Sequence, residues 1–295
     1  MQETVTGYEA PETLDGAVSV LQQHGGDAKV LAGGQSLLVL LQQGLLAPSV
    51  LVSLKRVLEL RSISFSPSDG MQIGAMVTQA ELERSDVVRE HYAALGEAAA
   101  VVAGVQIRNQ GTLGGNICHA DPTADPPAAL IALGATLELV GPAGKRMLPV
   151  EDFFRYFLEV DLADAEVLAR VLLPPPAPRH GSAYLKHRLR HGDRAIAGVA
   201  AWVQLAKDRL RIESIRIGLS GAGSTPLRPV PAEQLVRGHP ASEELLAACG
   251  EAAAAACEPL DDTEASAWYR REMVRVLVPR ALSISLRRAG SPAFR

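Results

Sequence analysis

Two double-glycine loops constrain the fold of this chain more than any other feature. Gly33-Gly34 lies in LAGGQSLL, residues 31–38, and Gly114-Gly115 lies in GTLGGN, residues 111–116. Glycine lacks a Cβ atom and adopts positive φ at little cost, so such loops can present bare backbone N–H groups to phosphate oxygens. Two of them in one chain indicate a large dinucleotide held from two sides.

Neighbouring polar residues agree with this interpretation. Ser36 adds a hydroxyl at the start of a helical pattern, and Thr112 adds a second hydroxyl donor. Asp125 can accept hydrogen bonds from ribityl or ribose hydroxyls, or it can cap a helix whose first turn contains Pro126. An ordinary strand-to-helix turn explains the first loop equally well. Neither loop is a GxGxxG or GxxxxGK motif, so NAD and ATP are not favoured.

Composition narrows the class of protein. The 295 residues, 47% hydrophobic and 21% charged, indicate a folded chain of about two domains. A net charge of −4 argues against nucleic acid as the main partner. Cys118, Cys249 and Cys257 are too scattered for a disulfide framework or an iron–sulfur cluster. No secretory signal or uninterrupted apolar span is recognisable, so a cytoplasmic location without a membrane span is expected.

Hydrophobic patterning predicts an α+β fold. Helices are expected at residues 12–24, 36–44, 78–85, 87–104, 126–133, 241–257 and 264–288, the last kinked at Pro279. Strands are expected at 28–33, at the end of 45–54, and at 62–67, 71–78, 134–141, 182–189, 195–205 and 212–221.

The clearest boundary is PPPAP at residues 174–178, because consecutive prolines continue neither a helix nor a central strand. The three strands beyond it are expected to be antiparallel. Three units are predicted, at residues 1–56, 57–177 and 178–295.

Several residues with reactive side chains have two interpretations each. His119 is either a catalytic or covalent flavin ligand or a loop histidine, and the loop histidine is favoured because no partner base is recognisable. Cys118 is more often a small buried hydrophobe than a nucleophile. His180, His187 and His191 are spaced poorly for one metal site. Lys186 and Asp193 flank KHRLRHGDR, where the lysine either stabilises a reduced ring or belongs to a solvated hairpin.

Together these motifs resemble the FAD-binding medium subunit of the molybdenum hydroxylases, the xanthine dehydrogenase and carbon monoxide dehydrogenase family. The matching stretches span nearly the whole chain in the family's order. They are LAGGQSLL, LAPSVLVSL, MQIGAMVTQAELE, IRNQGTLGGNICHADPTADPPAALIALGATLEL, YLKHRLRHGDRAIAGVA and GAGSTPLRPVPAEQLVRG.

The resemblance implies two α/β subdomains that clamp FAD in a vanillyl-alcohol-oxidase-type fold, followed by a C-terminal antiparallel sheet with helices. The backbone of residues 32–37 and 114–116 would hold the diphosphate, and Asp125 the ribityl chain. Leu168 and Lys186 would lie near the isoalloxazine. The full set of implied FAD contacts is Leu31, Ala32, Gly33, Gly34, Gln35, Ser36, Leu37, Val102, Thr112, Gly114, Gly115, Asn116, Ala120, Asp121, Asp125, Leu168, Lys186 and Asp193.

The resemblance also implies that substrate oxidation and electron transfer take place on different chains of one complex. Substrate would be oxidised at a molybdopterin in a large subunit, and electrons would pass through [2Fe-2S] clusters of a small subunit to non-covalent FAD here. The assembly would be a dimer of heterotrimers. A self-contained flavin oxidase or reductase, and a nucleotide-binding scaffold without redox activity, are the alternatives. Ser53 and Arg194 depart from the family pattern, which often has aspartate and an aromatic residue there.

The glycines of the two loops are expected to be essential for FAD binding. Valine at Gly33 or Gly114 is expected to abolish FAD retention, because its Cβ would occupy space needed by the diphosphate.

Overall fold

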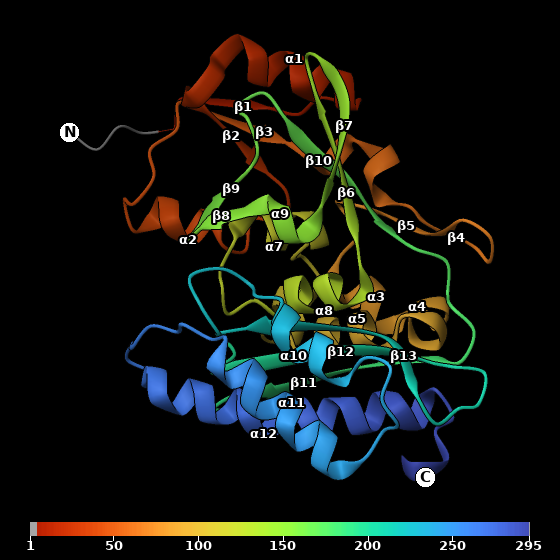
Figure 1. Ribbon diagram of the computed structural model, residues 1–295. Coiled ribbons are helices and arrows are strands. Elements are labelled where there is room, and N and C mark those ends of the chain that lie inside the picture. Colours follow the sequence, from red (N-terminus) through yellow and green to blue (C-terminus); the bar gives the residue numbers. More distant parts are fainter. Residues whose placement is uncertain (1–4, 295) are drawn as a thin grey trace.

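A computed structural model describes residues 5–294. The N-terminal part is a small parallel sheet of order β1-β3-β2, formed by β1 (Gly7–Glu9), β2 (Ala28–Leu31) and β3 (Val50–Ser53). Helix α1 (Leu14–His24) covers this sheet, and helix α2 (Leu37–Gln42) follows the first glycine loop (Figure 1).

The middle part is built on a five-stranded antiparallel sheet of order β4-β5-β10-β6-β7. Its strands are β4 (Ile63–Ser66), β5 (Gly70–Gly74), β6 (Thr136–Gly141), β7 (Gly144–Pro149) and β10 (Val167–Leu173). Its helices are α3 (Gln79–Arg84), α4 (Asp86–His91), α5 (Ala93–Ala100), α6 (Val105–Arg108), α7 (Leu113–His119), α8 (Asp125–Leu133) and α9 (Val150–Phe153). A short hairpin of β8 (Phe154–Tyr156) and β9 (Glu159–Val160) lies beside α7 and α9 (Figure 1).

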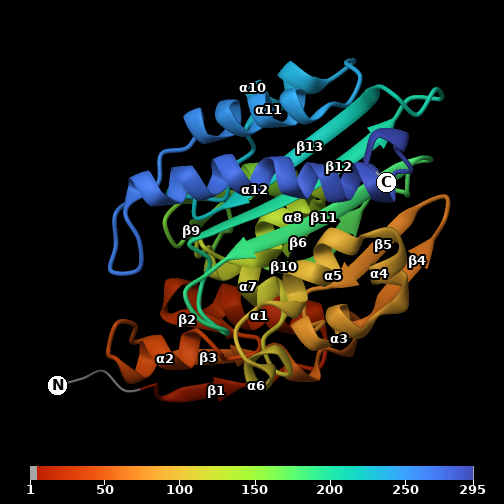
Figure 2. The ribbon, with the colours of Figure 1, turned by 90° about the horizontal axis from the view of Figure 1, so that it is seen from below.

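The C-terminal part is an antiparallel sheet of β11 (His180–His187), β12 (Ala197–Leu205) and β13 (Ile212–Ser220). Helices α5 and α8 of the middle part cover one face of this sheet, and α12 (Ala267–Arg288) covers the other (Figures 1 and 2). Helix α11 (Glu243–Ala255) packs against α12, and α10 (Val230–Val236) packs against α11 in the same hydrophobic core. Single 3₁₀ turns lie at Gly25–Asp27, Leu54–Arg56, Leu58–Arg61 and Pro292–Phe294.

The predicted α+β class and the three antiparallel C-terminal strands are confirmed. The helix expected at 87–104 is in fact two helices, α4 and α5, that meet at Tyr92. Patterning missed β10, which is nonetheless the central strand of the five-stranded sheet. No helix within residues 5–294 is long and apolar enough to cross a membrane.

Candidate functional site

The fold brings the two glycine loops into contact. A Cβ atom built on Gly33 would lie 2.2 Å from the carbonyl oxygen of Gln110 and 2.9 Å from the Cα of Gly111. On the other side, a Cβ on Gly115 would lie 3.4 Å from the Cβ of Ala32. Strand β2 delivers the first loop to this place, and α6 with the turn after it delivers the second.

The first loop is a cradle of free backbone donors. The amides of Gly33, Gly34, Gln35, Ser36 and Leu37 have no hydrogen-bond acceptor among residues 5–294. Gly34 has a φ of 73°, a conformation that glycine adopts without strain. Gln35 and Ser36 are exposed, so their amides are accessible. Consecutive free amides of this kind form an anion-binding concavity.

The second loop differs from its prediction, because its glycines lie in the first turn of α7 instead of in an open loop. The amide of Gly114 donates to the carbonyl of Ala75 at 2.9 Å, and the amide of Gly115 donates to Thr112 Oγ1 at 3.1 Å. The amide of Asn116 donates to the carbonyl of Thr112 at 3.0 Å. The expectation of bare N–H groups here was wrong. The free group is a side-chain acceptor instead: Asn116 Oδ1 is buried and has no partner in the described chain.

The space beside the glycines also differs from expectation. A Cβ on Gly114 would lie 2.5 Å from the Cβ of Ala75, and one on Gly33 would meet the backbone of Gln110. In both cases the chain itself fills the space that the diphosphate was expected to need. These glycines permit close packing of the two loops against their neighbours, and substitutions there act through the position of the backbone.

Asp125 neither caps a helix nor faces open solvent. The N-cap of α8 is Ala124, and Asp125 is 4% exposed. Its Oδ1 accepts from the Tyr184 hydroxyl at 2.6 Å, and its Oδ2 accepts from Lys186 Nζ at 2.8 Å. Burial raises the pKa of Asp125, while Lys186 and then Tyr184 act to lower it. The same burial, together with Asp125, raises the pKa of Tyr184 well above its usual range.

Lys186 therefore belongs to a buried ion pair, and the solvated-hairpin interpretation was wrong for it. Its side chain is 3% exposed, and its Nζ also donates to the carbonyl of Val101 at 3.1 Å. Tyr184 and Lys186 are two residues apart on β11, so both side chains point to the same face, toward α8. Sequence reasoning missed Tyr184, although this spacing on a predicted strand was the available signal.

Three further candidate residues lie on separate elements of the fold. Val102 follows α5, and its carbonyl accepts from Arg108 Nη1. Leu168 is 3% exposed on β10, within the hydrophobic core that also contains Ala120. Leu31 is the last residue of β2 and is half-buried. Their contact with a cofactor stays a prediction.

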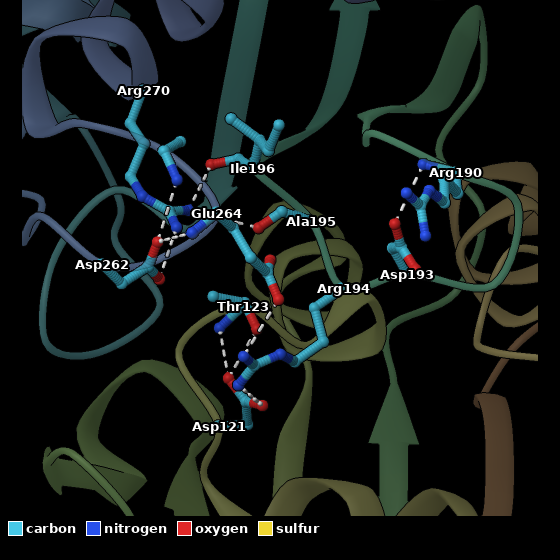
Figure 3. A network of polar contacts seen from close by, with 11 residues as sticks. Asp121, Thr123, Arg190, Asp193, Arg194, Ala195, Ile196, Asp262, Glu264 and Arg270 are labelled. Atoms are coloured by element: carbon cyan, nitrogen blue, oxygen red, sulfur yellow. Dashed lines mark hydrogen bonds and ion pairs between the residues drawn. The ribbon is translucent and has the colours of Figure 1, made fainter.

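Asp121 and Asp193 organise two turns. Asp121 Oδ1 accepts from the amide and the hydroxyl of Thr123 at 2.8 and 2.6 Å. Asp193 Oδ2 accepts from the amide of Arg190 at 2.9 Å. Arg194 forms ion pairs with Asp121 and Glu264 across two segments of the chain (Figure 3).

The remaining reactive side chains have ordinary environments. His119 ends α7, and its pKa is lowered, mainly by burial; Asp121 acts to raise it and Arg194 to lower it. Burial raises the pKa of the Cys118 thiol to about 12, so a thiolate is disfavoured there. His180 and His187 lie at opposite ends of β11, and His187 contacts the Tyr269 hydroxyl at 3.0 Å.

Two family models match the chain. The model described as FAD binding domain in molybdopterin dehydrogenase matches residues 3–176, and that described as CO dehydrogenase flavoprotein C-terminal domain matches residues 182–284. Together they define an FAD-binding unit followed by a flavoprotein C-terminal unit.

Individual relatives agree over the full length. The carbon monoxide dehydrogenase medium chain of Hydrogenophaga pseudoflava is 37% identical, over 96% of this chain and 98% of that protein. The xanthine dehydrogenase FAD-binding subunit of Escherichia coli O157:H7 is 30% identical, over 96% and 97%. The carbon monoxide dehydrogenase structure from Hydrogenophaga pseudoflava superposes with a TM-score of 0.93, covering 98% of this chain and 99% of that chain at 37% identity. The chain therefore belongs to the FAD-binding medium subunits of the molybdopterin dehydrogenases.

Proposed function

We propose that this chain carries electrons through a non-covalently bound FAD, from iron–sulfur clusters of a small partner chain to an external acceptor. Substrate oxidation would take place at a molybdopterin in a large partner chain. The observation that carries the proposal is the row of five free amides at Gly33–Leu37, held against α7 in a chain of this family. Bound FAD would supply the two-electron chemistry that no side chain of this site can perform.

The donors and acceptors fit FAD. The five amides are suited to the diphosphate, and the exposed Ser36 hydroxyl adds a further donor. The unpartnered Asn116 Oδ1 is an acceptor for a hydroxyl group of the cofactor. Asp125 already accepts one bond at each carboxylate oxygen, and each oxygen has a second lone pair for a ribityl hydroxyl.

A self-contained flavin oxidase or reductase is the alternative function. It needs a general base within reach of a substrate. The half-buried Cys118 does not provide one, because burial raises the pKa of its thiol to about 12. The three cysteines are also dispersed over α7, α11 and the turn after α11, which agrees with clusters on another chain.

The protein isolated from its native cells is expected to release all of its flavin on acid precipitation. The Cys118 thiol is held protonated, which disfavours covalent attachment through its sulfur. The measurement is the visible absorbance of supernatant and pellet, with identification of the released flavin as FAD. Yellow colour that remains with the pellet would show covalent attachment, and a colourless protein would remove the proposed function.

A further inference from the structure

Arg194, in the C-terminal part, forms ion pairs that reach the turn after α7 (Figure 3). Its Nη2 lies 3.0 Å from Glu264 Oε1, and its Nη1 lies 3.7 Å from Asp121 Oδ2. These two ion pairs, called here the Arg194 bridge, join three segments that are distant in sequence. They are the turn after α7, the connection between β11 and β12, and the segment before α12.

The Asp121 end of the bridge belongs to a tightly ordered turn. Besides its two bonds to Thr123, this turn is held by Gly221, whose amide donates to the carbonyl of Pro122 at 2.8 Å. Ala120, just before it, accepts from the amide of Leu158 at 3.3 Å. The turn therefore connects the end of α7 to the β8–β9 hairpin and to the end of β13.

The Glu264 end is equally ordered. Asp262 Oδ1 accepts from the amides of Glu264 and Ala265 at 2.9 and 3.0 Å. Arg270, which is 2% exposed, donates to Asp262 Oδ2 at 2.7 Å and to the carbonyl of Ile196 at 2.7 Å. Arg270 thus ties the Glu264 segment to the start of β12, directly after Arg194 (Figure 3).

The bridge adds little to global stability but can fix a position. The Arg194 side chain is 57% exposed, and ion pairs at this exposure contribute little to folding because solvent screens them. The Asp121 carboxylate is already held by Thr123, and Asp262 holds the backbone of Glu264, so the planar guanidinium fork meets two anchored segments. The main effect of the Arg194 bridge is therefore to fix the relative position of the segments that it joins.

We propose that Arg194 is a positioning residue for the flavin, because it fixes the Asp121 turn and the end of α7 against the C-terminal part. The inference rests on the proposed function, which places FAD at the first glycine loop and α7. Arg194 holds the segments together through its fixed positive charge and its planar guanidinium fork.

The test compares FAD release from the protein isolated with its natural partners. Arg194→Gln and Glu264→Gln are each expected to speed release about fivefold, equivalent to about 1 kcal/mol at 1.4 kcal/mol per factor of ten. The double variant should release FAD no faster than Arg194→Gln alone, because both changes break one bridge. Arg194→Lys should release FAD more slowly than Arg194→Gln, because lysine keeps the positive charge. The visible circular dichroism of the flavin should change in Arg194→Gln and return toward the wild-type spectrum in Arg194→Lys.

Arg211→Gln is the matched control. Arg211 is 59% exposed and pairs with Asp208 at 2.9 Å in the β12–β13 connection, remote from α7. It should leave the release rate and the flavin spectrum unchanged. The inference would be overturned if Arg194→Gln released FAD at the wild-type rate, or if the effects of the Arg194 and Glu264 changes were additive. Either result would leave the proposed function intact. A wild-type protein that holds no FAD would instead remove the proposed function, and this inference with it.

Discussion

Replacing Lys186 by methionine is expected to lower the free energy of unfolding by about 3–5 kcal/mol at neutral pH, because it leaves the buried Asp125 carboxylate without its cation. The pair is almost fully enclosed, with side chains 3% and 5% exposed. The measurement is denaturant unfolding followed by far-ultraviolet circular dichroism. The double variant Asp125→Asn/Lys186→Met should recover much of the loss, since no buried charge remains.

The decrease in the free energy of unfolding caused by Lys186→Met should also depend on pH. The pKa of Asp125 is raised by burial, and Lys186 acts against that rise, so the methionine variant should have a still higher folded-state pKa. A carboxyl whose folded pKa is raised favours the folded state most below its unfolded pKa of about 3.9 and loses that contribution as pH rises toward the folded pKa. The difference from wild type should therefore be smaller at pH 5 than at pH 7.

Lys145→Met provides the comparison for this variant. Lys145 is 61% exposed and lies 3.5 Å from Glu138, so its loss should cost at most about 1 kcal/mol. Equal effects of the Lys145 and Lys186 changes, or no pH dependence of the Lys186 effect, would contradict the burial of this pair.

Alanine at Gly33 is expected to weaken FAD binding by about thirtyfold, on the basis of about 2 kcal/mol for overpacking against rigid neighbours. The new Cβ would lie 2.2 Å from the Gln110 carbonyl oxygen, so the first loop must move away from the second. The row of free amides would then be displaced from α7. Titration of the protein with FAD, followed by flavin fluorescence, measures the change.

Gly26→Ala is the matched control in the same part of the fold. A Cβ on Gly26 would have ordinary contact with Asp164, at 3.5 Å from its Oδ2, and no positive φ has to be maintained there. FAD affinity should be unchanged in this variant. Full FAD affinity in Gly33→Ala would mean that the docking of the two loops does not position the cofactor site.

Local patterning predicted most elements because their signals are local. Alternation and turn residues identify β11, β12 and β13, and glycine and proline mark the ends of α8. Strand β10 was missed because its neighbours, β5 and β6, come from earlier in the sequence, and their pairing depends on tertiary structure.

The site was predictable only in part, because its contacts also depend on tertiary structure. Sequence located both glycine loops, but it could not show that the Gly114 amide is already used by Ala75. It named Asp125 and Lys186 separately, whereas their pairing depends on the docking of α8 on the C-terminal sheet. The interpretation of Lys186 as solvated failed because the facing helix is far away in sequence.

The composition of the complex isolated from native cells distinguishes an electron-transfer subunit from a self-contained flavin enzyme. A tagged form of this chain is expected to co-purify with a larger chain that carries molybdenum and a smaller chain that carries iron. Acid should release one FAD per copy of the tagged chain, and the chain freed of its partners should not hydroxylate substrate. Recovery of a solitary flavoprotein that oxidises a substrate by itself would contradict the subunit role and favour the self-contained enzyme.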